Sequence, residues 1–331
     1  MAHSVNYLLL STIRDNPAMG ISQYIKEIGR GKDGARALSR TQAADLFGQV
    51  LDGTVTDLEV GGFCLAMRIK GETESEMAGF LDATYARLTM VPACDRPLVV
   101  LPSYNGARKL PVLTPLLALL LAREGLPVLV HGTATESTRI SAQNVLLALG
   151  TPALTAIKKI AIGEVCFATT ELLCPGLKRL LDVRRAVGLR NPAHSLVKLM
   201  APCSGASLVV SSYTHPEYAV SMAATFARME SNALLLRGTE GEVVADPRRS
   251  PQMTGFLRGH PMLMQEAHSG PLAVVPDLPK EIDAQTTADY IRDVLVGHKP
   301  VPTPIAQQVA HILYLTKQVA LQTNEPSPAT V

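Results

Sequence analysis

Two loops of the sequence carry residues that could meet a phosphate group. The first follows the apolar run Leu98–Leu101 and reads Pro102-Ser103-Tyr104-Asn105-Gly106, with Arg108 and Lys109 shortly after it. The second follows the next apolar run and begins with His131-Gly132. Backbone amides and cationic side chains are the usual ligands of phosphate in proteins. The two loops are therefore the first place to look for a ligand site.

A second group of candidate residues lies between Lys158 and Lys198. This segment has eight basic and three acidic residues, an excess of five positive charges in a chain whose net charge is +2. The bases are Lys158, Lys159, Lys178, Arg179, Arg184, Arg185, Arg190 and Lys198. Such a run is often only a solvated helix face. The alternative is a surface for a phosphate backbone, which the symmetry of a dimer would double.

The remaining basic residues allow two interpretations as well. Arg108 and Lys109 are either solubilising loop charges or cations that meet a polymer backbone in place of bare amides. Arg248, Arg249 and Arg258 form a weaker cluster, for which an exposed loop is the simpler account.

The aromatic and histidine candidates are few. His131-Gly132 is either a remnant of a phosphate loop or a turn at the end of a strand, and His194 fits a packed or capping histidine better than a catalytic base. Tyr104 is the best candidate for base stacking. Aromatic residues make up only 4% of the chain, with no tryptophan, and this scarcity favours backbone contacts over base readout.

The elements that must position these residues form a βαβ pattern. A strand at Leu98–Leu101, an apolar helix at Thr114–Glu124 and a second strand at Pro127–Val130 are expected, followed by a helix that ends at Gly150. A right-handed crossover places both loops at the carboxyl ends of parallel strands. Open α/β sheets bind their ligands at that edge.

The rest of the chain predicts helices first and strands later. Residues 20–93 show helical periodicity, with Ser39 and Gln42 as a capping box and with Gly53, Gly61–Gly62 and Gly71 as breaks. A short helix is expected around Phe63–Ile69, and an amphipathic helix is expected after it within 70–88. Later strands are expected at Ile160–Phe167, Ser207–Ser212 and Ala233–Arg237, and helices within Leu172–Pro202 and at Pro216–Met229, Thr286–Leu295 and Pro304–Gln322.

These patterns predict an α/β protein with a small helical N-terminal domain and a larger α/β domain around a mostly parallel central sheet. The helical domain is placed at 1–93, joined by helices within 172–200. The α/β domain is placed at 94–171 and 201–322, and a disordered tail at 323–331.

Composition limits the class of protein. A hydrophobic content of 47% with 18% charged residues excludes a disordered chain, and no apolar run reaches the roughly 18 residues of a membrane span. The N-terminus is interpreted as mature sequence. Five cysteines without a CxxC pair favour reduced thiols in the cytoplasm, and neither a disulfide framework nor a metal site is expected.

Residues 37–83 and the segment VRRAVGLRNPAHSLVKLMAP (183–202) resemble the anthranilate phosphoribosyltransferases, of glycosyl transferase family 3. The order of elements matches over about 20–320. The resemblance implies the fold that this family shares with nucleoside phosphorylases, and a homodimer through the helical part. It implies substrate-site positions at Tyr104, Asn105, Gly106, His131, Gly132 and Arg184, the last matching the arginine that contacts the anthranilate carboxylate.

The catalytic motifs of the family are altered. Its Gly-Thr-Gly-Gly-Asp loop appears here as 102–106, where proline and tyrosine would hinder access to backbone amides. Its Lys-His-Gly-Asn motif appears as Val130-His131-Gly132-Thr133, without the lysine. Its magnesium-binding Asp-Glu pair falls near Gly238-Thr239-Glu240-Gly241-Glu242, where the two glutamates are not adjacent. In the segments 104–111, 130–139, 183–202 and 235–242 the chain resembles a divergent branch of the family with an altered phosphate loop. This resemblance implies a dimer that binds nucleic acid.

Three functions are therefore open. The first is a homodimer that binds DNA or RNA through its basic surface without sequence specificity, needs no cofactor and has lost anthranilate phosphoribosyltransferase activity. The second is an active phosphoribosyltransferase that uses phosphoribosyl pyrophosphate and Mg²⁺ with an altered substrate. The third is a structural or regulatory dimer partner, for which the sequence offers no specific signal. No membrane partner is expected.

Overall fold

The computed structural model describes residues 20–324, except positions 32, 137, 269, 271, 273 and 274. Four helices come first in this part of the chain: α1 (Ser22–Ile28), α2 (Arg40–Asp52), α3 (Asp57–Lys70) and α4 (Glu74–Tyr85). The N-terminus interpreted as mature sequence and most of the predicted tail, 325–331, lie outside the described residues.

The α/β part is built on one sheet. Its strands are β1 (Leu98–Ser103), β2 (Val128–Gly132), β3 (Val165–Thr169), β4 (Ser207–Tyr213), β5 (Ala233–Arg237), β6 (Met253–Leu257) and β7 (His260–Gln265). They lie in the order β3-β2-β1-β4-β5-β6-β7, parallel from β3 to β5 and antiparallel from β5 to β7. The predicted fold class, a helical domain beside a mostly parallel α/β domain, is confirmed.

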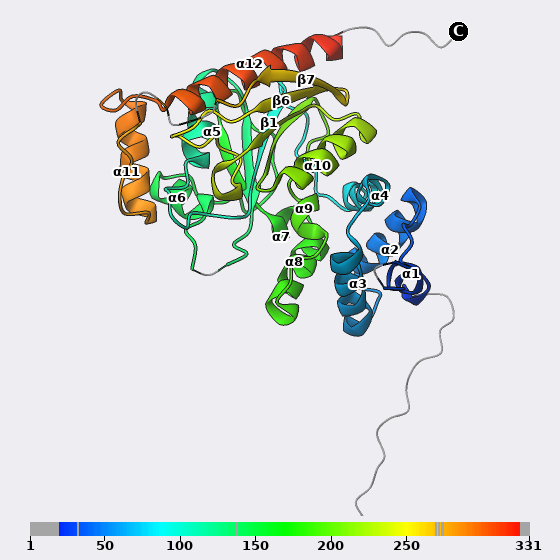
Figure 1. Cartoon of the computed structure of the whole chain (residues 1–331). Coiled ribbons are helices and arrows are strands. Elements are labelled where there is room, and N and C mark those ends of the chain that lie inside the picture. Colours follow the sequence, from blue (N-terminus) through cyan, green and yellow to red (C-terminus); the bar gives the residue numbers. More distant parts are fainter. Residues whose placement is uncertain are drawn as a thin grey trace, which may run out of the picture.

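Helices connect and cover the strands. They are α5 (Thr114–Arg123), α6 (Ala142–Ala148), α7 (Thr170–Leu173), α8 (Pro175–Val187), α9 (Ala193–Leu196), α10 (Pro216–Arg228), α11 (Ala284–Leu295) and α12 (Thr303–Asn324), with a 3₁₀ turn at Thr239–Gly241. In Figure 1, α5, α6, α11 and α12 lie with the sheet at one end of the molecule, and α1–α4 lie beside α8 and α9 at the other.

Alternate residues of the strands enter two separate cores because successive strand side chains point to opposite faces. Val99 and Leu101 of β1 belong to the core that includes Leu117 of α5 and residues of α11 and α12. Leu98 and Val100 belong to the core that α8–α10 and the helical domain complete. Because a strand of a parallel sheet is buried on both faces, its sequence is a continuous apolar run, and residues 98–101 form such a run.

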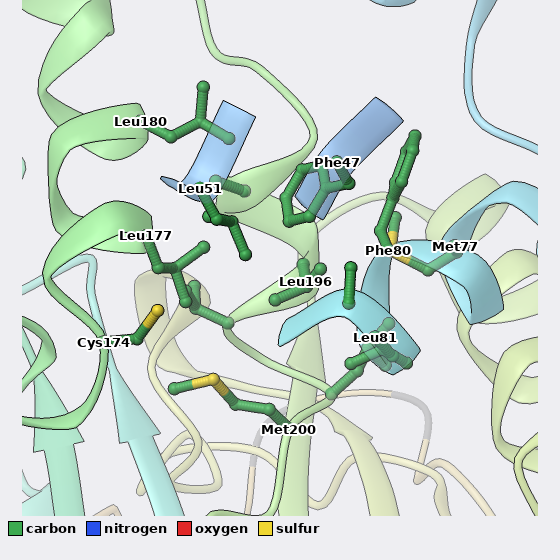
Figure 2. Packing of buried hydrophobic residues seen from close by; sticks show 14 of the residues in the cluster. Phe47, Leu51, Met77, Phe80, Leu81, Cys174, Leu177, Leu180, Leu196 and Met200 are labelled. Atoms are coloured by element: carbon green, nitrogen blue, oxygen red, sulfur yellow. The ribbon is translucent and has the colours of Figure 1, made fainter. Parts of the chain in front are cut away.

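The helical domain packs around aromatic rings. Phe47 of α2 stacks on Phe80 of α4, with ring centroids 4.6 Å apart. Figure 2 shows Leu177 and Leu180 of α8 facing Leu51 of α2 in the same core. The segment around α8 therefore lies against the first helices, although the division of the chain at 93 and 94 stays a prediction.

Local capping signals set the helix starts. The capping box of Ser39 and Gln42 is confirmed at α2. The predicted break at Gly61–Gly62 is wrong, since α3 begins at Asp57 and runs through both glycines. Thr56 and Glu59 form a second capping box at its start, which stabilises the first turn of a helix that contains two glycines.

Two other boundaries differ from expectation. The strand expected at Ile160–Phe167 begins only at Val165, because Gly163 adopts a left-handed conformation (φ +76°) and turns the chain just before it. The last helix continues to Asn324, so the predicted tail does not begin at 323. No helix of the described residues has the length and apolar character needed to cross a membrane.

Candidate functional site at the carboxyl edge of the sheet

The two predicted loops lie side by side at the carboxyl ends of β1 and β2. Ser103 pairs with Gly132 in register, and Gly132 pairs with Thr169 of β3 on its other side. A Cβ atom on Gly132 would come within 1.9 Å of the Ser103 carbonyl oxygen. The glycine of His131-Gly132 is therefore required by the close approach of two strands, which supports its interpretation as a strand-end feature.

Tyr104 is buried, so it is not a surface for base stacking as the sequence suggested. Its side chain is 5% exposed. Its hydroxyl lies 2.9 Å from Nδ1 of His131 and accepts a hydrogen bond of 3.0 Å from Thr170 Oγ1. Because Thr170 donates to the Tyr104 hydroxyl, the proton of that hydroxyl is free to be donated to Nδ1 of a neutral His131 imidazole. Burial lowers the pKa of His131 to about 3, which keeps this ring uncharged.

The buried imidazole predicts a loss of stability in acid. His131 has a lower pKa folded than the ordinary 6.5, so the unfolded chain binds the extra proton and the stabilisation present above pH 6.5 is lost as pH falls towards 3. Between pH 7 and 5 we expect His131 to contribute a loss of about 2 kcal/mol. Urea unfolding at several pH values measures it, and His131→Asn, which keeps an acceptor for Tyr104, should reduce the dependence by that amount.

Exposed His260 provides the matched control. His260→Asn should leave the pH dependence of unfolding as in the unmodified protein. An unchanged acid slope in His131→Asn would show that this imidazole is not the source.

Glu242 lies directly on the first loop. It is 2% exposed. Its Oε1 accepts from the amides of Asn105 (2.9 Å) and Gly106 (2.8 Å). Its Oε2 accepts from the hydroxyls of Ser103 (2.6 Å) and Thr114 (2.9 Å). Each oxygen of this carboxylate therefore has two donors, and its acceptor capacity is filled.

Glu240 holds the next part of the same loop. Its carboxylate accepts from the amides of Arg108 (2.8 Å), Lys109 (3.1 Å) and Leu110 (3.4 Å). The sequence suggested that bulky residues hinder access to the amides of this loop. The hydrogen bonds contradict that reason, because the amides are accessible and two carboxylates of the same chain occupy them.

The residues present do not fit a magnesium ion with a pyrophosphate group. Both carboxylates that would hold the metal are engaged with backbone amides and hydroxyls. Among the described residues, no group of three His, Cys, Asp or Glu side chains is placed to hold a metal ion.

Most of the predicted basic residues are already paired. Lys178 and Arg185 both contact Asp182, the former at short range and the latter at 3.5 Å. Arg184 lies 2.8 Å from Glu136, and Arg179 donates to a main-chain oxygen of α2. Lys158 and Lys159 pair with Glu164 and Asp95. The predicted run is therefore divided among several ion pairs and does not form one uniform basic surface.

Arg190 and Lys198 differ from most of the run. Within the described residues no carboxylate forms an ion pair with either one. Lys198 is 8% exposed, and its Nζ donates to the Gly241 carbonyl oxygen at 3.0 Å. Burial lowers the pKa of Lys198 to about 8 and, together with Arg184, lowers the pKa of Arg190.

Both residues line a cleft of about 770 Å³ between the helical domain and the carboxyl edge of the sheet. Its walls come from the α3–α4 connection, the two loops, α9 and α10. The cationic residues that line it are Arg68, Lys70, Arg108, Arg139, Arg190 and Lys198. Lys70 is held by buried Glu76 at 2.7 Å. Lys109 is exposed, but it is not a lining residue.

Sequence reasoning missed several residues of the cleft. Arg139 shares Glu136 with Arg184, and Tyr218 and His215 at the start of α10 lie with ring centroids 6.3 Å apart. Arg139 ends the second loop, 131–139, which the sequence predicts as part of the ligand site, whereas Tyr218 and His215 belong to no run or motif and are brought to the cleft only by folding.

His194 fits the packing interpretation. It is 8% exposed, and its Nδ1 lies 3.2 Å from Oδ1 of Asn191. Burial and the nearby Arg190 lower its pKa to about 4. In the weaker basic cluster, Arg248 pairs with the neighbouring Asp246 at 2.9 Å, and Arg258 donates to the distant Gln322 carbonyl oxygen. None of the three arginines of this cluster lines the cleft.

Comparisons with known proteins agree on a family. Residues 22–87 match the helical bundle domain of a glycosyl transferase family. The chain is 41% identical to the uncharacterized protein YbiB of Escherichia coli (strain K12) over 309 residues, which are 91% of this chain and 96% of that protein. It is 29% identical to the anthranilate phosphoribosyltransferase of Nocardioides sp. over 62% of this chain and 61% of the enzyme.

Solved structures show the same fold. Anthranilate phosphoribosyltransferase from Thermus thermophilus superimposes with a TM-score of 0.65 at 21% identity, over 90% of this chain and 92% of the enzyme. The enzyme of Saccharomyces cerevisiae in complex with PRPP and Mg gives 0.65 at 15% identity, over 90% and 89%. The chain therefore belongs to the anthranilate phosphoribosyltransferase-like family of glycosyl transferases, and it resembles YbiB over nearly its whole length.

Proposed function

We propose that this protein is a homodimer that binds DNA or RNA without sequence specificity and has lost anthranilate phosphoribosyltransferase activity. One observation carries the proposal: six cationic and four acidic residues line the cleft, and two of these cations, Arg190 and Lys198, form no ion pair with a carboxylate of the described residues. Glu242 and Glu136 act on these two cations only from beyond ion-pair distance, and desolvated cations without an ion-paired carboxylate favour an anionic ligand. A nucleic acid backbone supplies repeated phosphates, and its binding releases counterions.

The aromatic pair at the cleft supports a polymer ligand as well. Tyr218 is 37% exposed and lines the cleft beside His215. Exposed aromatic faces next to cations are typical of proteins that bind single strands, because every base offers a face for stacking. Tyr218 therefore replaces the buried Tyr104 as the candidate residue for base stacking.

The loss of transferase activity is supported by the closed first loop. Phosphoryl-linked chemistry depends on a metal ion and donors at the leaving pyrophosphate, whereas Glu240 and Glu242 occupy those donors here. No cofactor is therefore part of the proposal.

Fluorescence anisotropy with labelled single- and double-stranded oligonucleotides tests the proposal. Binding should be measurable at about 50 mM salt and should weaken by a factor of ten or more at about 200 mM, as counterion release requires. No binding at the lower salt concentration would refute it.

The homodimer is proposed from one face of α3. Leu58, Leu65 and Ile69 are 86%, 43% and 67% exposed, and their spacing places them on one side of the helix. Gly61 lies between them with no neighbour within 4 Å of an added Cβ. Such a face fits a second copy of α3 across a twofold axis. Leu65→Lys should convert dimers to monomers in sedimentation velocity, whereas Leu147→Lys, at an exposed position of α6, should not.

The alternative function is an active phosphoribosyltransferase with an altered substrate. The observation in its favour is Arg184, whose Nη1 is buried without a hydrogen-bond partner. Calorimetry with phosphoribosyl pyrophosphate and Mg²⁺ separates the two candidates, because only the enzyme should give binding heat.

We also propose a cytoplasmic location, since all five cysteines are free. Finding the protein mainly in an extracytoplasmic fraction after cell fractionation would overturn this proposal.

A further inference from the structure

The first loop already binds an anion, and that anion is part of the chain. Every position from Asn105 to Leu110 except Ala107 donates its amide to Glu240 or Glu242. Successive amides that converge on one point form a concave anion-binding site, and their bonds to a carboxylate are charge-assisted. The two carboxylates therefore lie where an external anion would need the same donors.

The segment 238–242, named here the acidic turn, has a backbone shaped for this placement. Glu240 adopts a left-handed conformation (φ +53°), which is uncommon for a residue with a side chain. A Cβ on Gly241 would come within 1.8 Å of Asn105 Nδ2, and one on Gly238 within 1.7 Å of the Glu242 carbonyl oxygen. The close approach of the acidic turn to the loop thus depends on glycine at 241, and the tight closure of the turn on itself depends on glycine at 238.

Contacts from the cleft side hold the acidic turn in place. The Gly241 carbonyl oxygen accepts hydrogen bonds from Lys198 Nζ (3.0 Å) and Ser212 Oγ (2.8 Å). Asn105 Nδ2 donates to the Glu240 carbonyl oxygen at 3.0 Å. These contacts hold the backbone of Glu240 in its left-handed conformation, although that conformation is strained.

We propose that residues 105–110 form an anion site whose resident ligand is the Glu240–Glu242 pair, so that the site is closed to inorganic pyrophosphate and opens to it when the carboxylate of Glu240 is removed. The inference rests on the hydrogen bonds of the loop and is independent of nucleic acid binding in the cleft. It explains why the amides of this loop are already occupied in a fold that is typical of phosphate-ester chemistry.

Glu240→Gly is the sharpest test. Glycine removes the carboxylate and also relieves the left-handed conformation, so the variant should fold. Glu230→Gly is the matched control: Glu230 is exposed, has φ +49°, and forms no ion pair within the described residues. Both variants lose one negative charge and one strained residue, but only Glu240→Gly frees the amides of Arg108 to Leu110.

The readouts are calorimetry with inorganic pyrophosphate alone and amide hydrogen exchange. We expect pyrophosphate to bind Glu240→Gly at least about tenfold more tightly than it binds the unmodified protein or Glu230→Gly, a difference of about 1.4 kcal/mol. Amides 108–110 should exchange faster in Glu240→Gly and regain protection when pyrophosphate is added.

Two results would overturn the proposal. The first is equal pyrophosphate affinity in all three proteins, which would show that the carboxylate of Glu240 does not close the site. The second is a folded Glu240→Gly protein whose amides 108–110 stay protected without ligand. Oligonucleotide binding by the same proteins is measured separately, so a failure of the nucleic acid proposal would leave this test intact.

Discussion

Replacing Arg190 by glutamate is expected to weaken oligonucleotide binding by roughly tenfold or more at about 50 mM salt, and to lower the slope of log affinity against log salt by about one. Arg190 lines the cleft and forms no ion pair among the described residues. Its positive charge is therefore available to a phosphate, and the new carboxylate would repel one. Anisotropy titrations over a series of salt concentrations measure both changes.

Lys317→Glu is the control for charge reversal. Lys317 is exposed on α12, outside the cleft, and its replacement changes the net charge by the same amount. It should alter affinity much less than Arg190→Glu. Equal losses in the two variants would indicate a response to net charge alone, and the cleft would then not be the binding site.

Replacing Glu242 by alanine is expected to destabilise the fold by about 3–5 kcal/mol, the range for removing one partner of a buried charged network. Four donors converge on this carboxylate: the amides of Asn105 and Gly106 and the hydroxyls of Ser103 and Thr114. Alanine would leave these buried donors without an acceptor. Urea unfolding followed by circular dichroism measures the change in the free energy of unfolding.

Two variants show whether the hydrogen bonds are responsible. Glu242→Gln keeps one acceptor oxygen for the amides, and the hydroxyls can rotate to accept from its NH₂ group, so a loss of only about 1–2 kcal/mol is expected. Glu74→Ala removes an exposed glutamate and should change stability by about 0.5 kcal/mol or less. A loss below about 1 kcal/mol for Glu242→Ala would contradict this account of the loop.

The basic run shows where reasoning from sequence loses accuracy. The eight cations between Lys158 and Lys198 allowed two interpretations, a solvated helix face or a common surface for a phosphate backbone. Folding pairs Lys178 with Asp182, only four residues away, but it also pairs Arg184 with Glu136, which lies 48 residues earlier. A charge count over the segment 158–198 includes a nearby partner such as Asp182 and omits a distant partner such as Glu136. Arg190 and Lys198 remain without carboxylate partners in the described part of the chain, and they line the cleft.

Local chemistry alone determined much of the architecture. The apolar run at 98–101, the glycine-bearing loop after it and the helix from Thr114 predict a βαβ unit, because strand burial and crossover handedness follow from short segments. The capping box of Ser39 and Gln42 spans three residues and was confirmed. Placing the candidate site at the ends of β1 and β2 needed only these local patterns.

What occupies that site was decided by tertiary structure alone. Glu242 meets Ser103 across 139 positions of the chain, and Glu240 meets Arg108 across 132. Neither glutamate carries a sequence signal for this contact, because it depends on the order of β1, β4 and β5 in the sheet and on the left-handed conformation of one residue. The sequence determined that a loop of amides lies at this edge, and the packing of distant strands determined that the chain's own carboxylates occupy it.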